Sequence, residues 1–409
     1  MAKKKKSNKG LFIALAIIAI IVIVAILVIY LVNPGGLRDK ILEKLNGGSS
    51  NSNTNNSGGS QNQSTLAQGE GELQFHMLDV GQGDWLLILL PDGKEMLIDS
   101  GNVSGSQSKY ADYKTYMDTY ITDGTIDYVM LTHSDKDHVT YMDEIFRDYT
   151  VLNLYMPALY STNSAITEET VPSSKLKILD DSGVDKTKAH INSGEYANFF
   201  IKAFEENCNI YLNLELDTDN DPSTLDPHSK ITSSDNTYSI TFFFENLDFY
   251  NSVDFETSNS SKSSHMKNGV SPTTIIEYNG KRIVLTGDSN QDNEPYMVQR
   301  MKDYYGGVID CDVLKVAHHG SHEGSSADYL EEVDPEYAMI SCNTSGNTFN
   351  HPRQVTLNRL KTYDSNMQLY RTDLHGNIVC IIDKDGNITI TPTNTNVSDE
   401  ALWKGADAA

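Results

Sequence analysis

Metal-binding side chains are concentrated between residues 132 and 140. This segment reads THSDKDHVT and contains His133, Asp135, Asp137 and His138. It directly follows the apolar run over residues 128–131, which is typical of the end of a buried strand. Imidazoles and carboxylates are costly to bury at such a position unless something binds them. Because imidazole suits transition metals and carboxylate suits harder ions, the segment predicts a site for a divalent cation.

Two further polar clusters follow strand-like runs later in the chain. Residues 282–286 lead into Gly287-Asp288, and residues 313–317 lead into His318-His319. Taken alone, Gly-Asp after a strand is usually a turn, and His-His before a glycine is compatible with a capped turn. Open α/β sheets place their sites at the carboxyl ends of strands, so clusters at three strand ends favour one shared metal centre.

The spacing of apolar residues predicts the elements that position these clusters. Strands are expected at 73–80, 85–90, 95–98, 126–131, 238–244, 273–278, 282–286, 313–317, 337–342, 378–383 and 388–391, and helices at 110–120, 142–148 and 355–362. Alternating strands and helices are typical of a layered α/β domain. Residues 161–267 are polar and predict an insertion with long loops. Its acidic run at 217–221 is more typical of a solvated loop than of a calcium loop.

The order and spacing of the motifs resemble the metallo-β-lactamase superfamily, and within it the carboxyl-terminal domain of ComEC-type competence proteins and its stand-alone relatives. The motifs are LDVGQGD at 78–84, LIDSG at 97–101, the cluster at 133–138, LTGD at 285–288, LKVAHHGS at 314–321, NHP at 350–352, and RTD at 371–373 with Gly376. The resemblance implies an α/β fold of the metallo-β-lactamase type, an αβ/βα four-layer sandwich. It would occupy residues 73–393, with the insertion at about 161–267 and a tail at 394–409 that carries no readable signal.

The same resemblance implies one or two divalent metal ions, zinc or manganese. One ion would be held by Asp137, His138, Asp288 and one of His318 and His319, and a second, bridged by Asp288, by His133 and Asp135. Asp99 would orient the site from the strand behind it, unless it is a plain turn residue. Asp79, Asp84 and Ser321 lie in the matching motifs, and we expect them to contact the metal ligands or the substrate.

Two positions depart from the pattern of the superfamily. Asp135 stands where the superfamily has its second histidine, a change that the ComEC-type subgroup shares. The position of the middle histidine falls near Asn268, which is followed by Ser271. Because an amide is a poor zinc ligand but suits harder ions, the metal position there is expected to be weak, filled by manganese, or empty.

The chemistry implied by the metals is hydrolysis. A divalent pair activates a water molecule and holds the attacked group. Asp137 could take the proton of that water. His351, in a proline-bounded loop, could reach the substrate or donate a proton to the leaving group. A loop histidine without a functional role fits the position of His351 equally well. The leading interpretation is a phosphodiesterase or nuclease. Hydrolysis of another ester, a lactone, a β-lactam or a cell-wall phosphoester, or a non-catalytic metal-binding or interaction module, stays open because fold alone does not choose.

The N-terminal residues predict attachment to a membrane. Five lysines within residues 1–10 precede an uncharged apolar run at 11–32. At about 1.5 Å per residue this run spans roughly 30 Å, the thickness of a bilayer core. A cleaved signal peptide has a shorter apolar stretch and a small-residue cleavage site, so we favour an uncleaved anchor. The basic flank stays in the cytoplasm, and residues 33–72 form a juxtamembrane segment and a Ser/Asn/Gly-rich linker to an extracytoplasmic domain.

The charge of the chain limits its partners. The formal net charge is −24, from 32 basic and 56 acidic residues. Non-specific nucleic-acid binding rests on basic surface, so the composition disfavours it. Metal ions could still bind one phosphodiester locally, and nucleic acid or another phosphodiester therefore remains a candidate substrate. The four cysteines form no C-x-x-C pair, and three lie in or beside apolar runs, which predicts buried thiols.

Overall fold

The computed structural model describes residues 68–213, 229–252, 254–343 and 349–406. The predicted anchor at 11–32, most of the predicted linker and the acidic run at 217–221 lie outside the described residues. Within the described part of the chain, no helix has the length and apolar character needed to cross a bilayer. The prediction of a single-pass anchor therefore stays a prediction.

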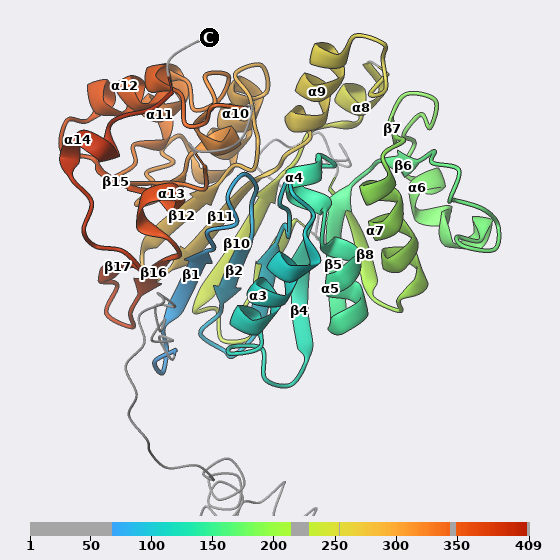
Figure 1. The fold of residues 1–409 in the computed structure, drawn as a ribbon, viewed down its shortest axis with the longest axis horizontal. Coiled ribbons are helices and arrows are strands. Elements are labelled where there is room, and N and C mark those ends of the chain that lie inside the picture. Colours follow the sequence, from blue (N-terminus) through green and yellow to red (C-terminus); the bar gives the residue numbers. More distant parts are fainter. Residues whose placement is uncertain (1–67, 214–228, 253, 344–348, 407–409) are drawn as a thin grey trace, which may run out of the picture. The chain divides into compact units, whose positions relative to one another are not determined.

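Among the described residues, eight strands form the first sheet, in the order β17-β16-β1-β2-β3-β4-β5-β8 (Figure 1). Their bounds are Leu73–Met77 for β1, Leu86–Leu89 for β2, Glu95–Ile98 for β3, Thr125–Met130 for β4, Thr150–Pro157 for β5, Asn209–Asn213 for β8, Ile378–Ile382 for β16 and Ile388–Pro392 for β17. Strands β3, β4, β5 and β8 run parallel. Because β2 is antiparallel to β3, the turn before β2 reaches the edge where β3 and β4 end.

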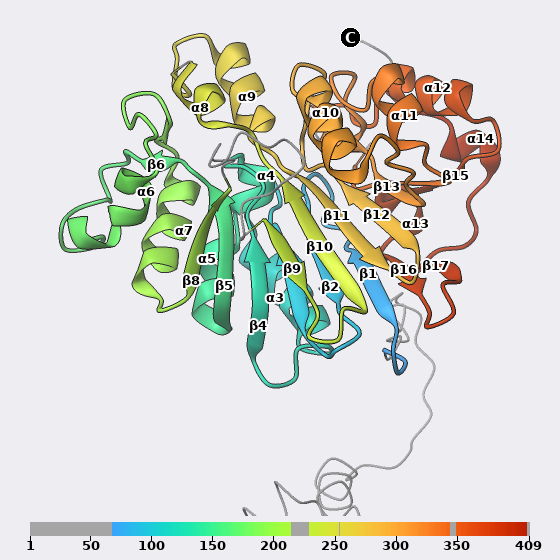
Figure 2. The same cartoon turned by 180° about the vertical axis from the view of Figure 1, so that it is seen from behind.

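The second sheet has seven strands among the described residues, in the order β15-β14-β13-β12-β11-β10-β9 (Figure 2). Their bounds are Lys230–Thr232 for β9, Tyr238–Phe243 for β10, Thr273–Tyr278 for β11, Lys281–Leu285 for β12, Val313–Lys315 for β13, Tyr337–Ile340 for β14 and Gln368–Arg371 for β15. Strands β12 to β15 run parallel, so their carboxyl ends also share one edge. The short strands β6 (Tyr160–Ser161) and β7 (His190–Ile191) pair separately.

Helices cover the outer face of each sheet. Helices α3 (Gln107–Met117), α5 (Met142–Asp148) and α7 (Gly194–Glu205) pack on the eight-stranded sheet. Helices α10 (Glu294–Tyr305), α11 (Ala327–Val333) and α12 (Gln354–Tyr363) pack on the seven-stranded sheet. The other helices are α4 (Lys136–Val139), α6 (Lys177–Asp181), α8 (Leu247–Ser252), α9 (Ser260–Gly269), α13 (Thr372–His375), α14 (Asp399–Leu402), and the 3₁₀ helices η2 (Ser173–Lys175) and η3 (Ala317–Gly320). This helix–sheet–sheet–helix order confirms the α/β sandwich expected from the sequence.

The two-residue period of the strands divides the interior into separate layers. In β1, Leu73, Phe75 and Met77 join the apolar core between the two sheets. Gln74 and His76 point to the opposite face, towards α3, and are equally buried. The imidazole of His76 lies 2.8 Å from the Tyr116 hydroxyl and 3.0 Å from Oε1 of Gln74. A buried polar pair is thus satisfied inside the helix-covered layer.

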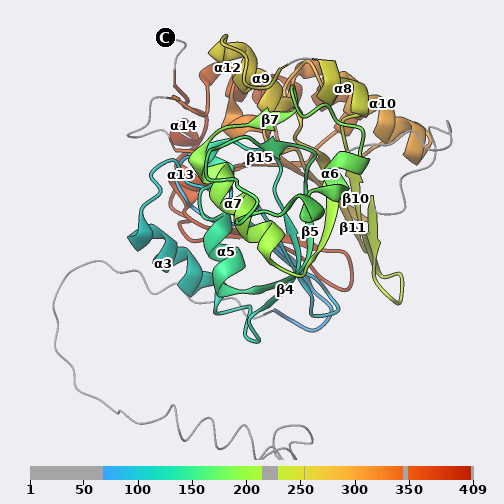
Figure 3. The same ribbon diagram turned by 90° about the vertical axis from the view of Figure 1, so that its right-hand side faces the viewer.

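The region from 161 to 267 is more regular than the sequence predicted. Besides the expected strand at 238–244, which is β10, the described part holds β8, which pairs with β5, and β9, which pairs with β10. Helix α7 buries Tyr196, Phe199 and Phe200 against the first sheet. Pairing with a long central strand stabilises short strands whose own sequence signal is weak. Helices α8 and α9 lie at the same end of the domain as α12 (Figure 3).

Candidate metal centre

The predicted ligands of both sheets meet at the edge where β3, β4, β12 and β13 end. The cluster at 133–138 comes from the loop after β4 and from α4. Asp288 follows β12, and His318 and His319 follow β13 within η3. The structure therefore brings together segments that are more than 150 residues apart in the sequence, as their position after parallel strands predicts.

Close backbone approach fixes the loop that carries Asp137. A Cβ atom on Gly101 would lie 1.9 Å from the carbonyl oxygen of Asp137, and one on Gly83 would lie 2.5 Å from the same oxygen. Neither position accepts a side chain without moving α4. His318 and His319 are held in the left-handed region, with φ of 49° and 53°. Such a conformation costs roughly 1–2 kcal/mol per residue and here allows both imidazoles to face the cluster.

The centre of the cluster is formed by His138, His319, Asp137 and Asp288. Nε2 of His138 lies 3.2 Å from Nε2 of His319 and 3.3 Å from Oδ1 of Asp288. Nε2 of His319 lies 3.4 Å from Oδ2 of Asp137 and 3.5 Å from Oδ2 of Asp288. Both imidazoles are fully buried. Two ring nitrogens and two carboxylates thus converge on one point.

Two further imidazoles, those of His133 and His318, also face Asp288. Nε2 of His133 and Nε2 of His318 are 3.8 Å and 3.7 Å from Oδ2 of Asp288. The Asn268 amide, where the superfamily has a histidine, lies 3.4 Å from Nδ1 of His318. When the amide is turned to satisfy both of its polar atoms, its nitrogen donates to Oδ2 of Asp135 at 3.2 Å. His318 therefore supplies an imidazole close to the position where the sequence suggested a missing nitrogen ligand.

Hydrogen bonds behind the cluster orient its imidazoles. Nδ1 of His138 lies 2.7 Å from Oδ2 of Asp99, so this aspartate contacts the cluster from the position just after β3. Nδ1 of His319 donates to the carbonyl oxygen of Ser341 at 2.9 Å. Ser271 lies 3.4 Å from Nδ1 of His133 and accepts from the backbone N–H of Asp288 at 3.2 Å. These bonds leave the opposite ring nitrogens free to face a cation.

Burial and charge act against each other throughout the cluster. Burial alone would raise the pKa of Asp288, but the imidazoles of His319 and His138 hold it well below its usual range. Burial would lower the pKa of His138, yet the carboxylates of Asp288 and Asp99 raise it well above its usual value. Burial and the neighbouring Asp137 carboxylate raise the pKa of Asp135 to about 7. Protons on the imidazoles thus offset the negative charge of the carboxylates, and a bound cation can offset the same charge.

The residues present fit a divalent-metal site. His133 Nε2 and Asp288 Oδ1 are buried polar atoms without a hydrogen-bond partner among the described residues. Both belong to a group with His138 whose candidate ligand atoms lie within 4.8 Å of one another. Orphaned buried atoms are rare in proteins and call for an explanation such as an ion. Imidazole and carboxylate are ligands that zinc and manganese both accept.

A buried lysine behind the cluster was missed by sequence reasoning. Nζ of Lys315 lies 2.7 Å from Oδ2 of Asp84, and both side chains are fully buried. The signal was available, because Lys315 is the charged residue in the apolar run over 313–317. With neutral imidazoles, the carboxylates of Asp84, Asp99, Asp135, Asp137 and Asp288 and this one ammonium leave the site a formal charge of −4, which two divalent cations would neutralise.

A pocket of about 290 Å³ opens over the cluster. It is lined by Gln82, Asp135, Asp137, Ser264, Asp288, His318, Ser321, His322, Glu323, Phe349, His351 and Arg353. His351, predicted from its proline-bounded loop, is 5% exposed, and its ring centre lies 5.2 Å from that of His318. Burial, with the neighbouring His318 and His319, lowers the pKa of His351 to about 3, so its imidazole is neutral. The pocket joins the cluster to groups that can contact a substrate.

The C-terminal segment supports the loop that lines this pocket. The backbone N–H of Gln354 donates to the carbonyl oxygen of Ala406 at 2.8 Å, and that of Ala406 donates to Pro352 at 3.0 Å. The guanidinium of Arg371 donates to the carbonyl oxygen of Leu402 at 2.8 Å. The tail showed no readable signal in the sequence because its backbone groups make these contacts, and such contacts leave no side-chain pattern.

One predicted site residue lies elsewhere. Asp79 is exposed and does not line the pocket; its Oδ1 accepts from the backbone N–H of Gly81 at 3.3 Å, and its own N–H donates to Asn377 at 2.8 Å. Contact of Asp79 with a ligand or substrate therefore stays a prediction, since the contacts seen here are with the neighbouring turn. Asp79 sits in the turn that leads to Gly83, and its contacts stabilise that turn.

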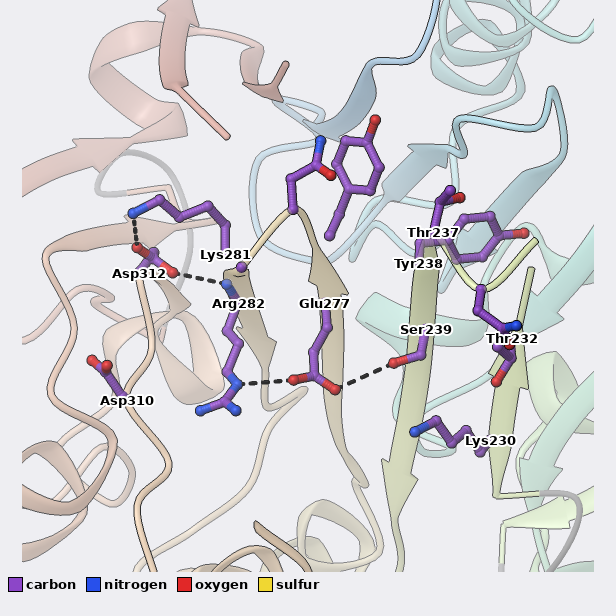
Figure 4. Close-up of a pocket in the computed structure, with 14 residues that line it drawn as sticks. Lys230, Thr232, Thr237, Tyr238, Ser239, Glu277, Lys281, Arg282, Asp310 and Asp312 are labelled. Atoms are coloured by element: carbon purple, nitrogen blue, oxygen red, sulfur yellow. Dashed lines mark hydrogen bonds and ion pairs between the residues drawn. The ribbon is translucent and has the colours of Figure 1, made fainter. Parts of the chain in front are cut away.

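A larger pocket of about 620 Å³ lies at the opposite end of the second sheet, where β12 begins (Figure 4). Four of its charged side chains form two ion pairs. Lys281 lies 2.7 Å from Asp312, and Arg282 lies 3.0 Å from Glu277, which also accepts from Ser239 at 3.2 Å. None of its lining residues belongs to a group of metal-type ligands found among the described residues. Metal chemistry is therefore assigned to the smaller pocket.

The comparison with known families agrees with the geometry. Residues 78–161 match the family model described as the metallo-beta-lactamase superfamily. These residues carry the metallo-β-lactamase family-model domain. Such domains are typically hydrolases, and their fold implies a divalent-metal site. The clusters of His133, His138 and Asp288 and of Asp137, His138 and His319 are compatible with that expectation.

Sequence relatives of this metallo-β-lactamase domain include competence proteins. The chain is 34% identical over 128 residues to competence protein ComA of Neisseria gonorrhoeae, covering 31% of this chain and 18% of that protein. It is 24% identical over 328 residues to ComE operon protein 3 of Bacillus subtilis, covering 76% of this chain and 33% of that protein. The resemblance to ComEC-type proteins is thus confirmed. The chain spans a third or less of the length of these relatives.

Similar solved structures are more remote. The metallo-beta-lactamase fold protein YhfI of Bacillus subtilis is 12% identical, with 78% of this chain and 100% of that chain covered and a TM-score of 0.37. Zn(2+)-bound PqqB from Methylobacterium extorquens is 11% identical, with 72% of this chain and 97% of that chain covered and a TM-score of 0.35.

Proposed function

We propose that the domain is a metal-dependent phosphodiesterase that cleaves nucleic acid, held outside the cell membrane by its N-terminal segment. The observation that carries the proposal is the convergence of His138, His319 and Asp288 within 3.5 Å of one another under an open pocket. The competence-protein relatives support a nucleic-acid substrate, and the apolar run at 11–32 supports the anchor.

The distances favour two ion positions that share Asp288. We assign Asp137, His138 and His319 to the first position, because their ligand atoms surround one point. We assign His133 and His318 to the second, with Asp135 at its edge. The second position has two imidazoles and carboxylates, so it suits manganese as well as zinc. When bound, the ions supply an activated water molecule and polarise a phosphoryl oxygen.

The chain's own groups bind and orient the substrate. Burial would raise the pKa of Asp137, but His319 and His138 hold it below the usual range. A carboxylate with a low pKa is a weak base, so Asp137 is better suited to bind a metal ion than to accept a proton. Neutral His351 can donate a hydrogen bond to a phosphoryl or leaving-group oxygen, as its place in the pocket allows. The Arg353 side chain lines the same pocket and can pair with a phosphate oxygen.

The test measures hydrolysis by the purified full-length chain with zinc or manganese. Substrates are bis-(p-nitrophenyl) phosphate, single-stranded DNA, and a panel of carboxylic esters and lactones. We expect phosphodiester cleavage that the double variant His133→Ala/Asp137→Ala lacks. A matched control is His265→Ala, because this histidine of α9 pairs with Asp292 and belongs neither to the ligand groups nor to the lining of the pocket.

Each outcome separates the candidate functions. Phosphodiester cleavage no faster than that of the double variant contradicts the proposal. Cleavage of carboxylic esters alone assigns the domain to the second class of hydrolase. Fewer than one metal ion per chain, measured by elemental analysis, supports a non-catalytic module instead.

A further inference from the structure

The buried ion pair of Lys315 and Asp84 lies directly behind the metal-ligand cluster. Besides its 2.7 Å contact with Asp84, Nζ of Lys315 donates to the carbonyl oxygen of Gly287 at 3.1 Å. Gly287 immediately precedes Asp288. The backbone N–H of Asp84 donates to the carbonyl oxygen of Asp137 at 3.1 Å. The pair therefore connects the loops that carry two carboxylates of the cluster, one from each half of the domain.

Asp84 faces the rear of two imidazoles without taking their hydrogen bonds. Its carboxylate oxygens lie 3.6 Å from Nδ1 of His319 and 3.9 Å from Nδ1 of His138. Those ring nitrogens are already bonded to Ser341 and Asp99. The main contact of the Asp84 carboxylate is thus with the ammonium of Lys315. Asp84 neutralises a cation rather than orienting an imidazole.

The position of Lys315 creates a conflict with metal binding. Burial would lower its pKa, but the carboxylates of Asp84 and then Asp288 raise it, so the side chain is charged. Asp288 is also the carboxylate that both ion positions share. A lysine ammonium sits on a flexible four-carbon stem and can change partners. Without Asp84, the strongest remaining attraction for the ammonium is that of Asp288, which directly follows Gly287.

We propose that Asp84 is a positioning residue that holds the Lys315 ammonium away from Asp288 and so keeps this shared carboxylate available to metal ions. The proposal rests on the proposed function, since it assumes that the cluster binds divalent ions. In this proposal the ion pair of Lys315 and Asp84 controls the affinity of the site for metal ions and also connects the two halves of the domain.

The proposal predicts opposite effects for the two single variants. Asp84→Asn leaves an uncompensated ammonium beside the site, which repels a divalent ion and competes for Asp288, and we expect Mn²⁺ affinity to fall at least about tenfold. Lys315→Met removes the competing cation and leaves a carboxylate, so affinity stays at or above that of the native protein. The double variant Asp84→Asn/Lys315→Met removes both charges, and its affinity returns to within about threefold of native.

The experiment titrates the full-length chain with Mn²⁺ and with Zn²⁺ against a chromophoric chelator, and records thermal unfolding in EDTA to establish that each variant is folded. A merely structural pair would weaken binding in both single variants, with no recovery in the double variant, and that result overturns the proposal. Native-like affinity of folded Asp84→Asn also overturns it. A native chain that binds neither ion refutes the proposed function instead.

A second comparison decides the matter if Asp84→Asn does not fold. Lys315→Met keeps the Asp84 carboxylate, whereas the double variant does not. Because neither protein has an ammonium for residue 84 to hold, we expect both to bind Mn²⁺ no more than about threefold more weakly than the native chain. A loss of affinity of about tenfold or more in either protein overturns the proposal.

Discussion

Replacement of Asp99 by asparagine tests how the site orients His138. Oδ2 of Asp99 lies 2.7 Å from Nδ1 of His138, so Nδ1 carries a hydrogen, and Nε2 is the ring nitrogen that faces Asp288 and His319 and that must be unprotonated to bind a metal ion. Asp99 has φ of 56°, a conformation that asparagine tolerates better than most residues. The other oxygen accepts from the backbone N–H of Thr132 at 2.8 Å, and the amide oxygen of asparagine can keep that bond.

The substitution is expected to reverse the tautomer of His138. The asparagine amide nitrogen then faces Nδ1 as a donor, so Nδ1 must accept and the hydrogen moves to Nε2. Nε2 can no longer bind a metal ion until this arrangement is broken. Loss of a hydrogen bond to a charged group costs about 1.5–3 kcal/mol, and we expect metal affinity to fall about tenfold to a hundredfold.

The assay measures Mn²⁺ and Zn²⁺ affinity by chelator competition and the His138 tautomer by ¹⁵N chemical shifts of the imidazole. Ser100→Ala is the matched control, because the buried Ser100 hydroxyl, next to Asp99 in the chain, has no hydrogen-bond partner among the described residues. We expect its affinity to change by less than about threefold. Native affinity in Asp99→Asn, with Nδ1 of His138 still protonated, would refute the reasoning.

Two further predictions concern other parts of the domain. Burial lowers the pKa of His76 to about 3, so the stability that comes from its neutral form is complete above pH 6.5 and is lost as the pH falls towards 3. Between pH 7 and pH 5, the free energy of unfolding of the native protein, measured with urea in EDTA, should therefore fall by about 2 kcal/mol more than that of His76→Gln. Equal losses in the two proteins would contradict this prediction. Deletion of residues 398–409 removes the backbone support of Gln354, so we expect kcat/KM for bis-(p-nitrophenyl) phosphate to fall about tenfold to a hundredfold with unchanged metal content; loss of metal as well would show that the segment supports the whole domain.

Local sequence patterns predicted several elements with little error. Helix α5 and strands β3 and β11 have the predicted bounds, because each combines a clear apolar period with polar or turn residues on both sides. Strand β8 and helix α14 were missed. Strand β8 depends on pairing with β5, and α14 is held through backbone carbonyl groups by Arg371, so neither has a strong signal of its own.

The sequence by itself determined which residue types could bind metal and that they follow strand ends. His133, Asp137, His138 and Asp288 were identified from such positions, since a strand's carboxyl end can be read from the apolar run before it. Asp99 was identified from its motif and not from any local pattern.

Tertiary structure decided how those residues are paired. Only the structure separates His319, which faces Asp137, from His318, which faces Asn268, because both follow the same strand and their left-handed backbone sets the direction of each ring. It alone also places Lys315 against Asp84 and the C-terminal segment beside the pocket. These contacts join segments remote in sequence, and the energy of a buried charge or backbone group depends on the partner that folding brings to it.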